Sequence, residues 1–421
     1  MKKLIFFLIF LCSINIHAQW VVQPSGVTTS LRSVVFYNQN KGLTVGLGGK
    51  ILKTTNGGLL WNVVNSGTTQ DLYSVNYSFS FQDSLTVFAC GANGTILRST
   101  DGGTSWNQVT SGTSSALRSI SNIHTNFLLN PVIAVGDNGV ILNSDDDGLS
   151  WSGDTSSTTR QLNSLIYFSD GNSGFFSYCA GNNGTMLKTR DYIDNKYVFH
   201  IDTTFPGTSE NLLGMAYWNL IYACTDSGKI FKTRIIPVTS WIQINSGVNV
   251  PLRSISAAYS STKVWAVGNN GTIRYSADTG NTWTGQNSFT TLNLYSIFML
   301  DSIRGWIVGD AGTISKTING GGPIGIKPIS TEIPSAYLLL QNYPNPFNPN
   351  SKIKFQIAAP GFTKLTVFDI LGRETVSLVN EQLKPGSYEV EWDASNFPSG
   401  IYFYKLQTSN FSETKKMMLL K

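Results

Sequence analysis

Charge is scarce in this sequence, and one acid is almost missing from most of it. Charged residues make up 13% of the 421 residues, and residues 19–321 contain a single glutamate, Glu210. The formal charge of +5 includes Lys2 and Lys3, so the remaining chain is too weakly basic to indicate a nucleic-acid partner. The apolar run Leu4–Leu11 is too short to cross a bilayer, and no transmembrane segment is expected. With 40 glycines, the composition indicates a β-rich fold with many turns.

Cysteine and histidine are also few. Beyond Ala18, the cysteines are Cys90, Cys179 and Cys224, an odd number without paired spacing, so no disulfide framework is expected. Cys90 and Cys224 fill an apolar slot that valine occupies in other copies of a repeated segment, which predicts buried thiols. His124 and His200 lie far apart, and no phosphate-binding glycine loop opens a helix. We therefore expect neither a metal site nor a cofactor.

The segment 1–18 has the pattern of a secretory signal peptide. Met1–Lys3 is basic, Leu4–Leu11 is apolar, and Ile16–Ala18 is an acceptable cleavage site. Cys12 would suit a lipoprotein anchor, but the preceding leucine is bulkier than that processing normally allows. The mature chain is predicted to begin near Gln19 and to be exported.

Residues 19–321 repeat one unit. A turn glycine recurs at Gly49, Gly94, Gly139, Gly184, Gly228, Gly271 and Gly312, with spacings of 45, 45, 45, 44, 43 and 41 residues. This period, built from short alternating segments and turns, is typical of a β-propeller with one four-stranded blade per repeat. Helical repeats would need long amphipathic runs, which are not found. The expected fold class is all-β, with a seven-bladed propeller.

The spacing of tryptophans predicts how the ring closes. The Trp that opens a fourth strand stands at a fixed spacing before the Leu that opens the next unit, as in Trp106 and Leu117. Trp20 stands at the same spacing before Leu31. The last unit stops near Gly321 without a Trp strand, so the segment after Trp20 is predicted to complete the seventh blade. The fourth unit also lacks its Trp, and residues 191–211 are expected to be an irregular insertion.

The turn before each Trp resembles the Asp-box of sialidase-type (BNR) repeats, as in Ser99–Trp106. The full unit is similar to propellers of the photosystem II assembly and stability factor family, over about residues 19 to 321. We expect the turn acids to hydrogen-bond their own backbone amides, which also accounts for Asp145–Asp147 without calcium. The predicted structural residues are Asn56, Trp61, Asp101, Trp106, Asp146, Trp151, Asp278 and Trp283.

The resemblance to sialidases implies an arginine triad, a Tyr nucleophile, a Glu and an acid/base Asp. The sole glutamate of this region, Glu210, lies between two units, and the arginines occupy repeat-equivalent positions, so a sialidase is improbable and no catalytic residue is predicted. The alternative is a secreted glycan-active hydrolase that uses Asp carboxylates at the channel mouth. Its candidate acids lie near connections predicted on one face: Asp71, Asp137, Asp226 and Asp310.

One repeated position is a candidate binding site. It follows the Leu that opens each first strand, and its side chains would cluster at one mouth of the ring: Arg32, Tyr73, Arg118, Asn163, Arg253 and Tyr295. Arginine and tyrosine suit carboxylates, polar ligands and protein surfaces. The competing interpretation is that the position only packs neighbouring blades, since packing alone would also repeat. The expected partner is an extracellular protein or a glycan.

The C-terminal part reads as a linker, residues 322–336, followed by a small immunoglobulin-like β-sandwich, residues 337–421. Asn342–Pro349, Val367–Gly372 and Ser399–Tyr402 resemble the C-terminal sorting domain of the type IX secretion system. This resemblance implies the secretion machinery as a partner, release or attachment at the surface, and a bacterium of the Bacteroidetes–Chlorobi–Ignavibacteria kind. An adhesion domain is the alternative. An extracellular address argues against photosystem assembly.

Overall fold

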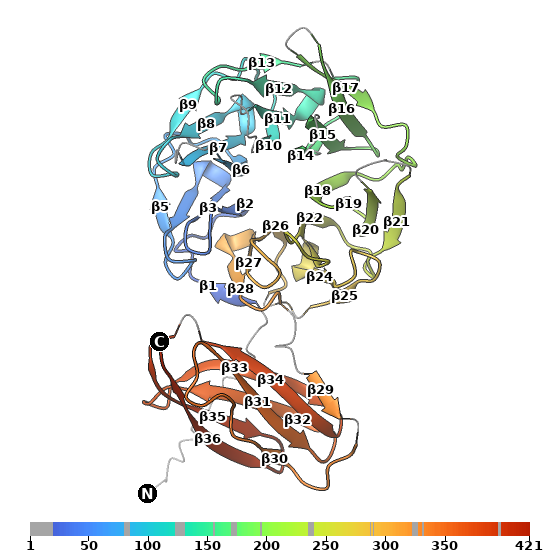
Figure 1. Cartoon of the computed structure of the whole chain (residues 1–421). Coiled ribbons are helices and arrows are strands. Elements are labelled where there is room, and N and C mark those ends of the chain that lie inside the picture. Colours follow the sequence, from blue (N-terminus) through green and yellow to red (C-terminus); the bar gives the residue numbers. More distant parts are fainter. Residues whose placement is uncertain are drawn as a thin grey trace, which may run out of the picture. The chain divides into compact units, whose positions relative to one another are not determined.

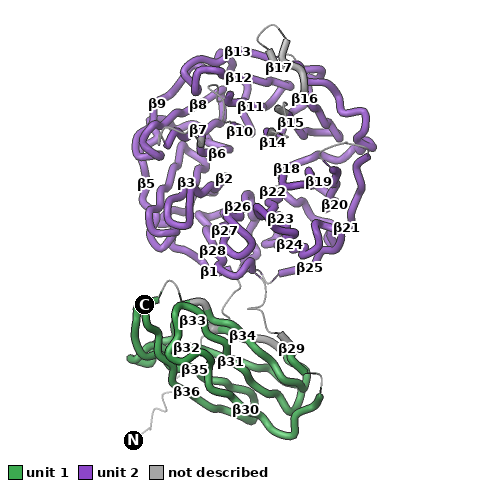
Figure 2. Tube along the Cα trace, in the orientation of Figure 1, with its two compact units in different colours: residues 1–18, 322–421 green, residues 19–321 purple. Residues whose placement is uncertain are grey.

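The structure is a computed structural model. It describes residues 20–79, 85–122, 131–154, 156–169, 175–193, 196–234, 240–286, 288, 290–321, 327–330, 332–394 and 397–421. The chain divides into two compact units, one of residues 19–321 and one that includes residues 322–421 (Figure 2). The predicted signal peptide and His124 lie outside the described residues. Within the described part, no helix is long and apolar enough to span a membrane.

The fold is all-β and propeller-like, with nine four-stranded sheets among the described residues. The first unit contains seven of them, which follow one another around a ring (Figure 1). The first three sheets consist of β2 (Leu31–Phe36), β3 (Gly42–Gly46), β4 (Ile51–Thr54) and β5 (Asn62–Val64); β6 (Leu72–Phe79), β7 (Leu85–Gly91), β8 (Ile96–Ser99) and β9 (Asn107–Val109); and β10 (Leu117–Asn122), β11 (Val132–Gly136), β12 (Ile141–Ser144) and β13 (Ser152–Gly153). The next three consist of β14 (Leu162–Ser169), β15 (Phe175–Gly181), β16 (Met186–Ile193) and β17 (Lys196–Ile201); β18 (Leu212–Trp218), β19 (Leu220–Thr225), β20 (Lys229–Arg234) and β21 (Ile242–Asn245); and β22 (Leu252–Ala257), β23 (Val264–Gly268), β24 (Ile273–Ser276) and β25 (Thr284–Gly285).

The seventh sheet joins the two ends of this unit. It contains β26 (Leu294–Met299), β27 (Gly305–Gly309) and β28 (Ile314–Thr317), and its fourth strand is β1 (Val21–Gln23). β1 pairs antiparallel with β28, and Trp20, the residue that precedes β1 in the sequence, is fully buried. The predicted pairing of the segment after Trp20 with the last repeat is therefore confirmed. β26 also contacts β2, so the inner strands form a closed circuit.

Serine hydroxyls link the inner strands of neighbouring sheets. The Oγ atom of Ser33 accepts a hydrogen bond from the backbone N–H of Val75 at 3.2 Å, and the same contact recurs around the ring. The further acceptors are Ser74, Ser119, Ser164, Ser254 and Ser296, the last of which binds the backbone of Val34. Gly214 takes the serine position in β18, and a Cβ there would lie 2.8 Å from the carbonyl oxygen of Arg253. The repeated serine thus joins successive sheets, and the one exception is a glycine at which a side chain would meet the backbone of the next inner strand.

The turns between second and third strands contain the recurring glycine of the repeat. Asn270 and Gly271 both adopt positive φ angles, 55° and 67°, which favour glycine and asparagine. Five of these turns form short 3₁₀ segments: η1 (Leu47–Gly49), η2 (Ala92–Gly94), η3 (Asp137–Gly139), η4 (Asn269–Gly271) and η5 (Asp310–Gly312). They bring their polar residues to the end of the sheets where the inner strands begin.

The fourth sheet corrects one prediction. Part of the expected irregular insertion is a β-hairpin, because β16 and β17 pair as far as Ile193 and Lys196, with a register shift between Lys188 and Asp191. Leu187 pairs with Ile201 and Lys188 with His200, so Phe199 occupies the position that Trp holds in other sheets, and it is 1% exposed. The fourth repeat thus has Phe at the position where the other repeats have Trp, and for this reason the repeat is hard to recognise in the sequence.

The second unit contains two sheets around one core. Their orders are β29 (Lys327–Ser330), β34 (Gly386–Asp393), β31 (Asn350–Ile357), β30 (Leu338–Leu339), and β33 (Glu374–Leu383), β32 (Gly361–Phe368), β35 (Gly400–Gln407), β36 (Ser412–Leu419). The alternating apolar residues predicted for its strands are buried in this core, among them Phe355, Val367 and Tyr404. Residues 327–330, expected in the linker, instead form a strand paired with β34.

Candidate functional site

The six candidate binding residues all lie on the inner strands, one residue after the strand-opening leucine. Each is partly buried, which is intermediate between a packed core residue and a free surface residue. The equivalent position of β18 is Leu213, also partly buried, so the position is polar in six sheets and apolar in one. We call these seven residues the inner-ring position.

Two arginines of the inner-ring position share one tyrosine. The guanidinium carbon of Arg32 lies 3.8 Å from the ring centroid of Tyr295, and that of Arg253 lies 5.3 Å from the same centroid. Cation–π contacts of this kind hold a guanidinium in place without neutralising its charge. Among the described residues, Arg253 donates only to the amide oxygen of Asn269, at 2.6 Å, and the Nε atom of Arg32 has no hydrogen-bond partner. This part of the ring therefore retains positive charge.

Arg118 is neutralised instead. Its Nε and Nη2 atoms donate to the two carboxylate oxygens of Asp137, both at 2.9 Å, and its guanidinium also lies over the ring of Tyr73. The hydrogen bonds to Asp137 raise the pKa of Arg118. A bidentate pair satisfies an arginine, so this third member is less available to a ligand than the first two.

Asn163 is also internally bonded. Its Nδ2 atom donates to the side-chain oxygen of Asn182 and to the carbonyl oxygen of Leu212, both at 2.9 Å. Its own amide oxygen accepts a hydrogen bond from Gln161 at 2.6 Å. The packing interpretation fits Asn163 and Arg118, whereas Arg32 and Arg253 keep donors available.

The acids of the hydrolase alternative hold neighbouring polar groups. Asp71 accepts a hydrogen bond from the backbone of Gly48, and both carboxylate oxygens of Asp226 accept hydrogen bonds from Asn211. Burial raises the pKa of Asp310, but hydrogen bonds from Ser30, Tyr295 and Asn293 hold it below its usual range.

Glu210 is paired with Lys229. Burial raises the pKa of Glu210, but the charge of Lys229 and hydrogen bonds from Lys229, Ser227 and Thr225 together lower it below its usual range. A general acid needs a raised pKa, and in the described part of the chain every resolved shift of a carboxylate is downward.

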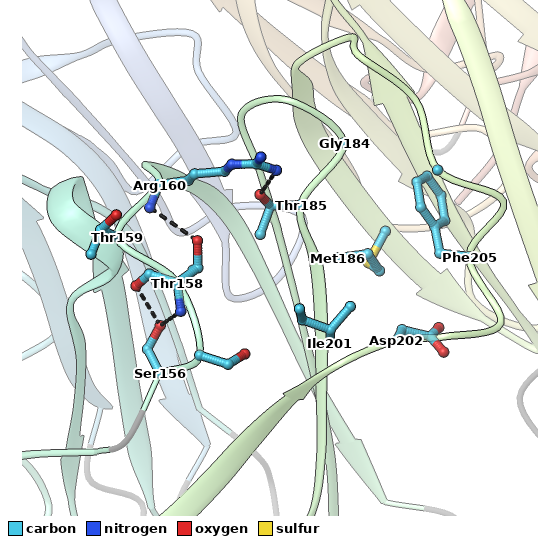
Figure 3. A pocket seen from close by; sticks show the side chains of 12 residues that line it. Ser156, Thr158, Thr159, Arg160, Gly184, Thr185, Met186, Ile201, Asp202 and Phe205 are labelled. Atoms are coloured by element: carbon cyan, nitrogen blue, oxygen red, sulfur yellow. Dashed lines mark hydrogen bonds between the residues drawn. The ribbon is translucent and has the colours of Figure 1, made fainter.

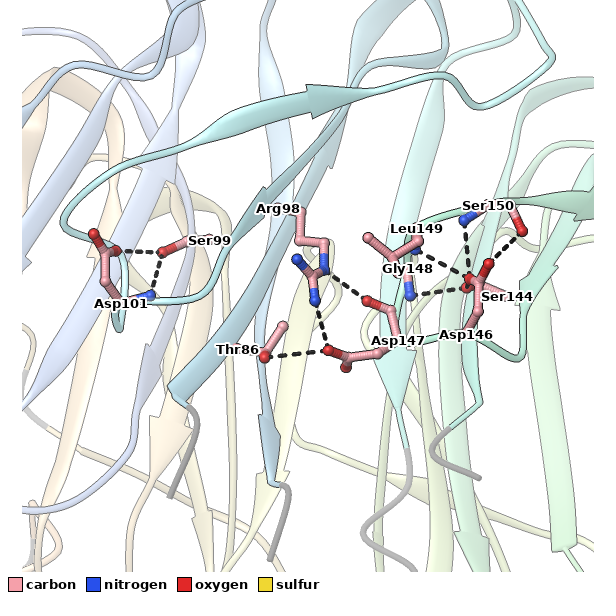
Figure 4. A network of polar contacts seen from close by, with 10 residues as sticks. All are labelled: Thr86, Arg98, Ser99, Asp101, Ser144, Asp146, Asp147, Gly148, Leu149 and Ser150. Carbon is pink, nitrogen blue, oxygen red and sulfur yellow. Dashed lines mark hydrogen bonds and ion pairs between the residues drawn. The ribbon is translucent and has the colours of Figure 1, made fainter. Parts of the chain in front are cut away.

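The Asp-box acids hold their own turns (Figure 4). Oδ1 of Asp101 accepts hydrogen bonds from the backbone N–H groups of Thr104 and Ser105, both at 2.9 Å. Asp146 and Asp278 make the equivalent contacts, and the amide oxygen of Asn56 accepts from Leu60. The tryptophans that close these turns are buried or partly buried: Trp61, Trp106, Trp151 and Trp283.

These turns also dock on the neighbouring sheet, which the sequence analysis did not anticipate. Arg98, on β8 of the second sheet, donates to the backbone oxygen and the carboxylate of Asp147 in the turn of the third sheet, both at 2.7 Å (Figure 4). Lys232 bonds the turn of the sixth sheet in the same way, through the carbonyl oxygen of Thr279. In both cases the basic residue directly precedes a Ser or Thr near the end of the third strand.

Metal ligands do not gather in the described residues, where no group of three or more His, Cys, Asp or Glu side chains could hold an ion. Cys90, Cys179 and Cys224 are buried free thiols, which confirms the burial predicted for Cys90 and Cys224. Burial raises the pKa of the Cys224 thiol to about 12, so it is not a reactive thiolate.

Together these features define a propeller-like ring of short sheets held by Asp-box turns, followed by a two-sheet C-terminal unit. Residues 341–420 match the family described as the secretion system C-terminal sorting domain. Residues 13–115 and 238–318 match the family of the photosynthesis system II assembly factor YCF48. Both predicted resemblances are therefore confirmed.

Solved structures share the ring. The structure titled "YCF48 bound to D1 peptide" has a TM-score of 0.55 and 19% identity, and the match covers 72% of this chain and 95% of that one. YCF48 from Cyanidioschyzon merolae has a TM-score of 0.55 and 20% identity, with 71% and 98% covered. The WD40 propeller domain of Doa1 has a TM-score of 0.54 and 13% identity, with 71% and 96% covered. Identities this low show a shared fold alone. Among curated proteins, the sequence has no match.

Proposed function

We propose that residues 19–321 form a seven-bladed β-propeller that acts outside the cell as a non-catalytic binding module. In this proposal, residues 337–421 form an immunoglobulin-like sorting domain that carries the protein through the type IX secretion system, by way of the periplasm, to the cell surface or the medium. The match of residues 341–420 to a sorting-domain family supports export.

The observation that carries the binding role is the arrangement of Arg32 and Arg253 over Tyr295. Neither guanidinium has a carboxylate within ion-pair distance among the described residues, although Asp310 acts on Arg32 electrostatically. Two oriented cations in a partly buried setting suit a carboxylate on a protein or an acidic glycan. A peptide is bound in one of the structures with the same fold, which is compatible with this use of the ring.

The test uses the mature chain, residues 19–421, with poly-glutamate and polygalacturonate as probes in an interferometric binding assay. We expect at least one probe to bind. The double variant Arg32→Gln/Arg253→Gln should weaken that binding by about tenfold or more, because two charge-assisted contacts are lost. Arg118→Gln should have a smaller effect, because Asp137 already occupies that guanidinium.

The control is Arg234→Gln, which removes an exposed arginine from the end of β20. Equal binding by the double variant and this control, at equal melting temperatures, would contradict the proposed site. Steady release of reducing ends from polygalacturonate by the mature chain would favour the hydrolase alternative instead.

A further inference from the structure

A cavity between the third and fourth sheets of the first unit is separate from the inner-ring position. Its volume is about 710 Å³, within the range of ligand sites. One wall is the connector of residues 156–160, and the other consists of residues 184–186 and 201–207 (Figure 3). Such a volume accommodates a short stretch of peptide.

The sequence beside this cavity differs from the other repeats in the connector after the fourth sheet. The residue that pairs with the start of the third strand is apolar in three other sheets, Val64, Val109 and Ile244, and polar in the remaining three, Gln23, Asp154 and Gln286. In the fourth sheet it is Asp202, whose backbone N–H donates to Met186. The connector that follows is also longer, because Phe199 stands two positions farther from Leu212 than the equivalent Trp stands from the next strand-opening Leu in other sheets.

Asp202 anchors the start of that longer connector, where its carboxylate accepts hydrogen bonds from the backbone N–H and the hydroxyl of Thr204. Its carboxylate is 2% exposed and accepts hydrogen bonds from Lys188 at 2.8 Å and from the indole N–H of Trp241 at 3.0 Å. These bonds outweigh the effect of burial and lower the pKa of Asp202, so the buried carboxylate stays ionised and paired. Phe205 then packs on Phe231 and Trp241 of the fifth sheet, at 5.0 and 5.4 Å between ring centroids. These ring contacts fix the connector at Phe205 to the fifth sheet.

The lining has a cationic polar side and an aliphatic side (Figure 3). Arg160 is exposed, and its Nη1 atom donates to the carbonyl oxygen of Asn183 at 3.0 Å and to the Thr185 hydroxyl at 3.5 Å, which leaves Nε and Nη2 available. The hydroxyl group of Thr158 lies beside it and accepts from the Arg160 backbone. Opposite, Ile201 provides the exposed aliphatic surface, at 61% exposed, whereas Met186 is 2% exposed and belongs to the core.

From this lining we propose that the cavity binds an extended peptide segment in which an acidic residue follows an aliphatic one. The carboxylate pairs with Arg160, and the aliphatic side chain lies against Ile201. Sugar rings usually need an exposed aromatic face, whereas Phe205 is the sole aromatic residue of the described lining and is only 8% exposed. This cavity uses residues other than the inner-ring position. A peptide ligand bound here is therefore a proposal in addition to the proposed function.

The experiment measures binding of the fluorescently labelled, C-amidated peptide Ser-Leu-Asp-Ser to residues 19–421 by anisotropy. We expect saturable binding that weakens at least tenfold with Arg160→Gln or Ile201→Asp, and with peptides carrying Asn for Asp or Ala for Leu. The matched controls are Arg234→Gln and Ile242→Asp, which change an exposed arginine and a 55% exposed isoleucine outside the cavity. They should leave binding unchanged.

The inner-ring variant Arg32→Gln/Arg253→Gln separates the two proposals. Peptide binding that survives this variant but not Arg160→Gln supports the cavity. Binding lost with the inner-ring variant but kept with Arg160→Gln would overturn this inference and leave the proposed function intact. No saturable binding at about 1 mM peptide, or displacement by trigalacturonate without any peptide selectivity, would also overturn it.

Discussion

At the scale of single residues, the Asp-box carboxylate replaces hydrogen bonds that a tight turn cannot make within its own backbone. Asp278 accepts from the backbone N–H groups of Asn281 and Thr282 at 3.1 and 2.9 Å, and from the Thr282 hydroxyl at 2.7 Å. The Thr282 amide is the main reason that the pKa of Asp278 falls to about 2. The acid is therefore a structural element rather than a proton donor.

The first prediction concerns pH. Because the folded-state pKa of Asp278 is depressed, its contribution to stability is present above the unfolded pKa of about 4 and disappears as pH falls toward 2. Asp278→Asn keeps one acceptor oxygen, as Asn56 does in the first sheet, but cannot titrate. We expect its melting temperature to lie below that of the wild type at pH 7 and to converge with it near pH 2. Melting curves from pH 2 to 7 test this, and parallel curves for the two proteins would contradict it.

A second residue-scale prediction concerns the link between neighbouring sheets. Arg98 and Asp147 form an ion pair at 2.7 Å with side chains 18% and 37% exposed, so solvent screens it only in part. A double-mutant cycle with Arg98→Met and Asp147→Asn should give a coupling of about 1 kcal/mol in the free energy of unfolding. The control cycle pairs Arg98→Met with Asp278→Asn in a distant sheet, where the effects should add. Equal coupling in the two cycles would refute a specific link.

At the scale of elements, β1 is the strand whose loss would change the ring most. It joins residues near the start of the unit to β28, and it follows Trp20, whose indole N–H donates to Gln286 at 2.9 Å. An unpaired β28 would leave an open sheet edge at the seam. The closing strand therefore serves the whole ring and not only one sheet.

Trp20→Ala should lower the free energy of unfolding by about 3–5 kcal/mol, since a fully buried indole is removed. Val22→Ala is the matched control, because that side chain is 57% exposed on the same strand and should cost little. Urea unfolding of both variants followed by intrinsic fluorescence provides the comparison. Similar midpoints for the two variants would show that the segment does not close the ring.

At the scale of the whole molecule, repetition made the architecture readable and also set the limit of the sequence analysis. The strand pattern, the pairing of β1 and the burial of Cys90 follow from period and polarity alone. Phe199 is not evident from the repeat because a phenylalanine replaces the usual Trp, and the longer connector after it changes the spacing to the next strand-opening Leu. Which inner-ring arginines remain available depends on contacts across the fold, such as Arg118 with Asp137, that spacing along the chain does not encode.

The last prediction concerns the address of the protein. If the C-terminal unit is a sorting domain, a chain ending at residue 321 should accumulate in the periplasm, while the full chain reaches the surface or the medium. The truncation lies between the two compact units, so the ring keeps all its strands and should melt at the same temperature in either form. Immunoblots of periplasm, outer membrane and medium measure the distribution.

A finer variant of the same test is Asn342→Ala within the full chain. The buried Asn342 side chain donates to Pro344 and Ser351, and its loss should disturb the local structure of the sorting unit without touching the ring. Export of the truncated chain at the level of the full chain would rule out the sorting role. Retention of both the truncated and the Asn342→Ala chains would place the signal in the folded C-terminal unit, because the point variant keeps nearly all of the sequence and changes chiefly its local structure.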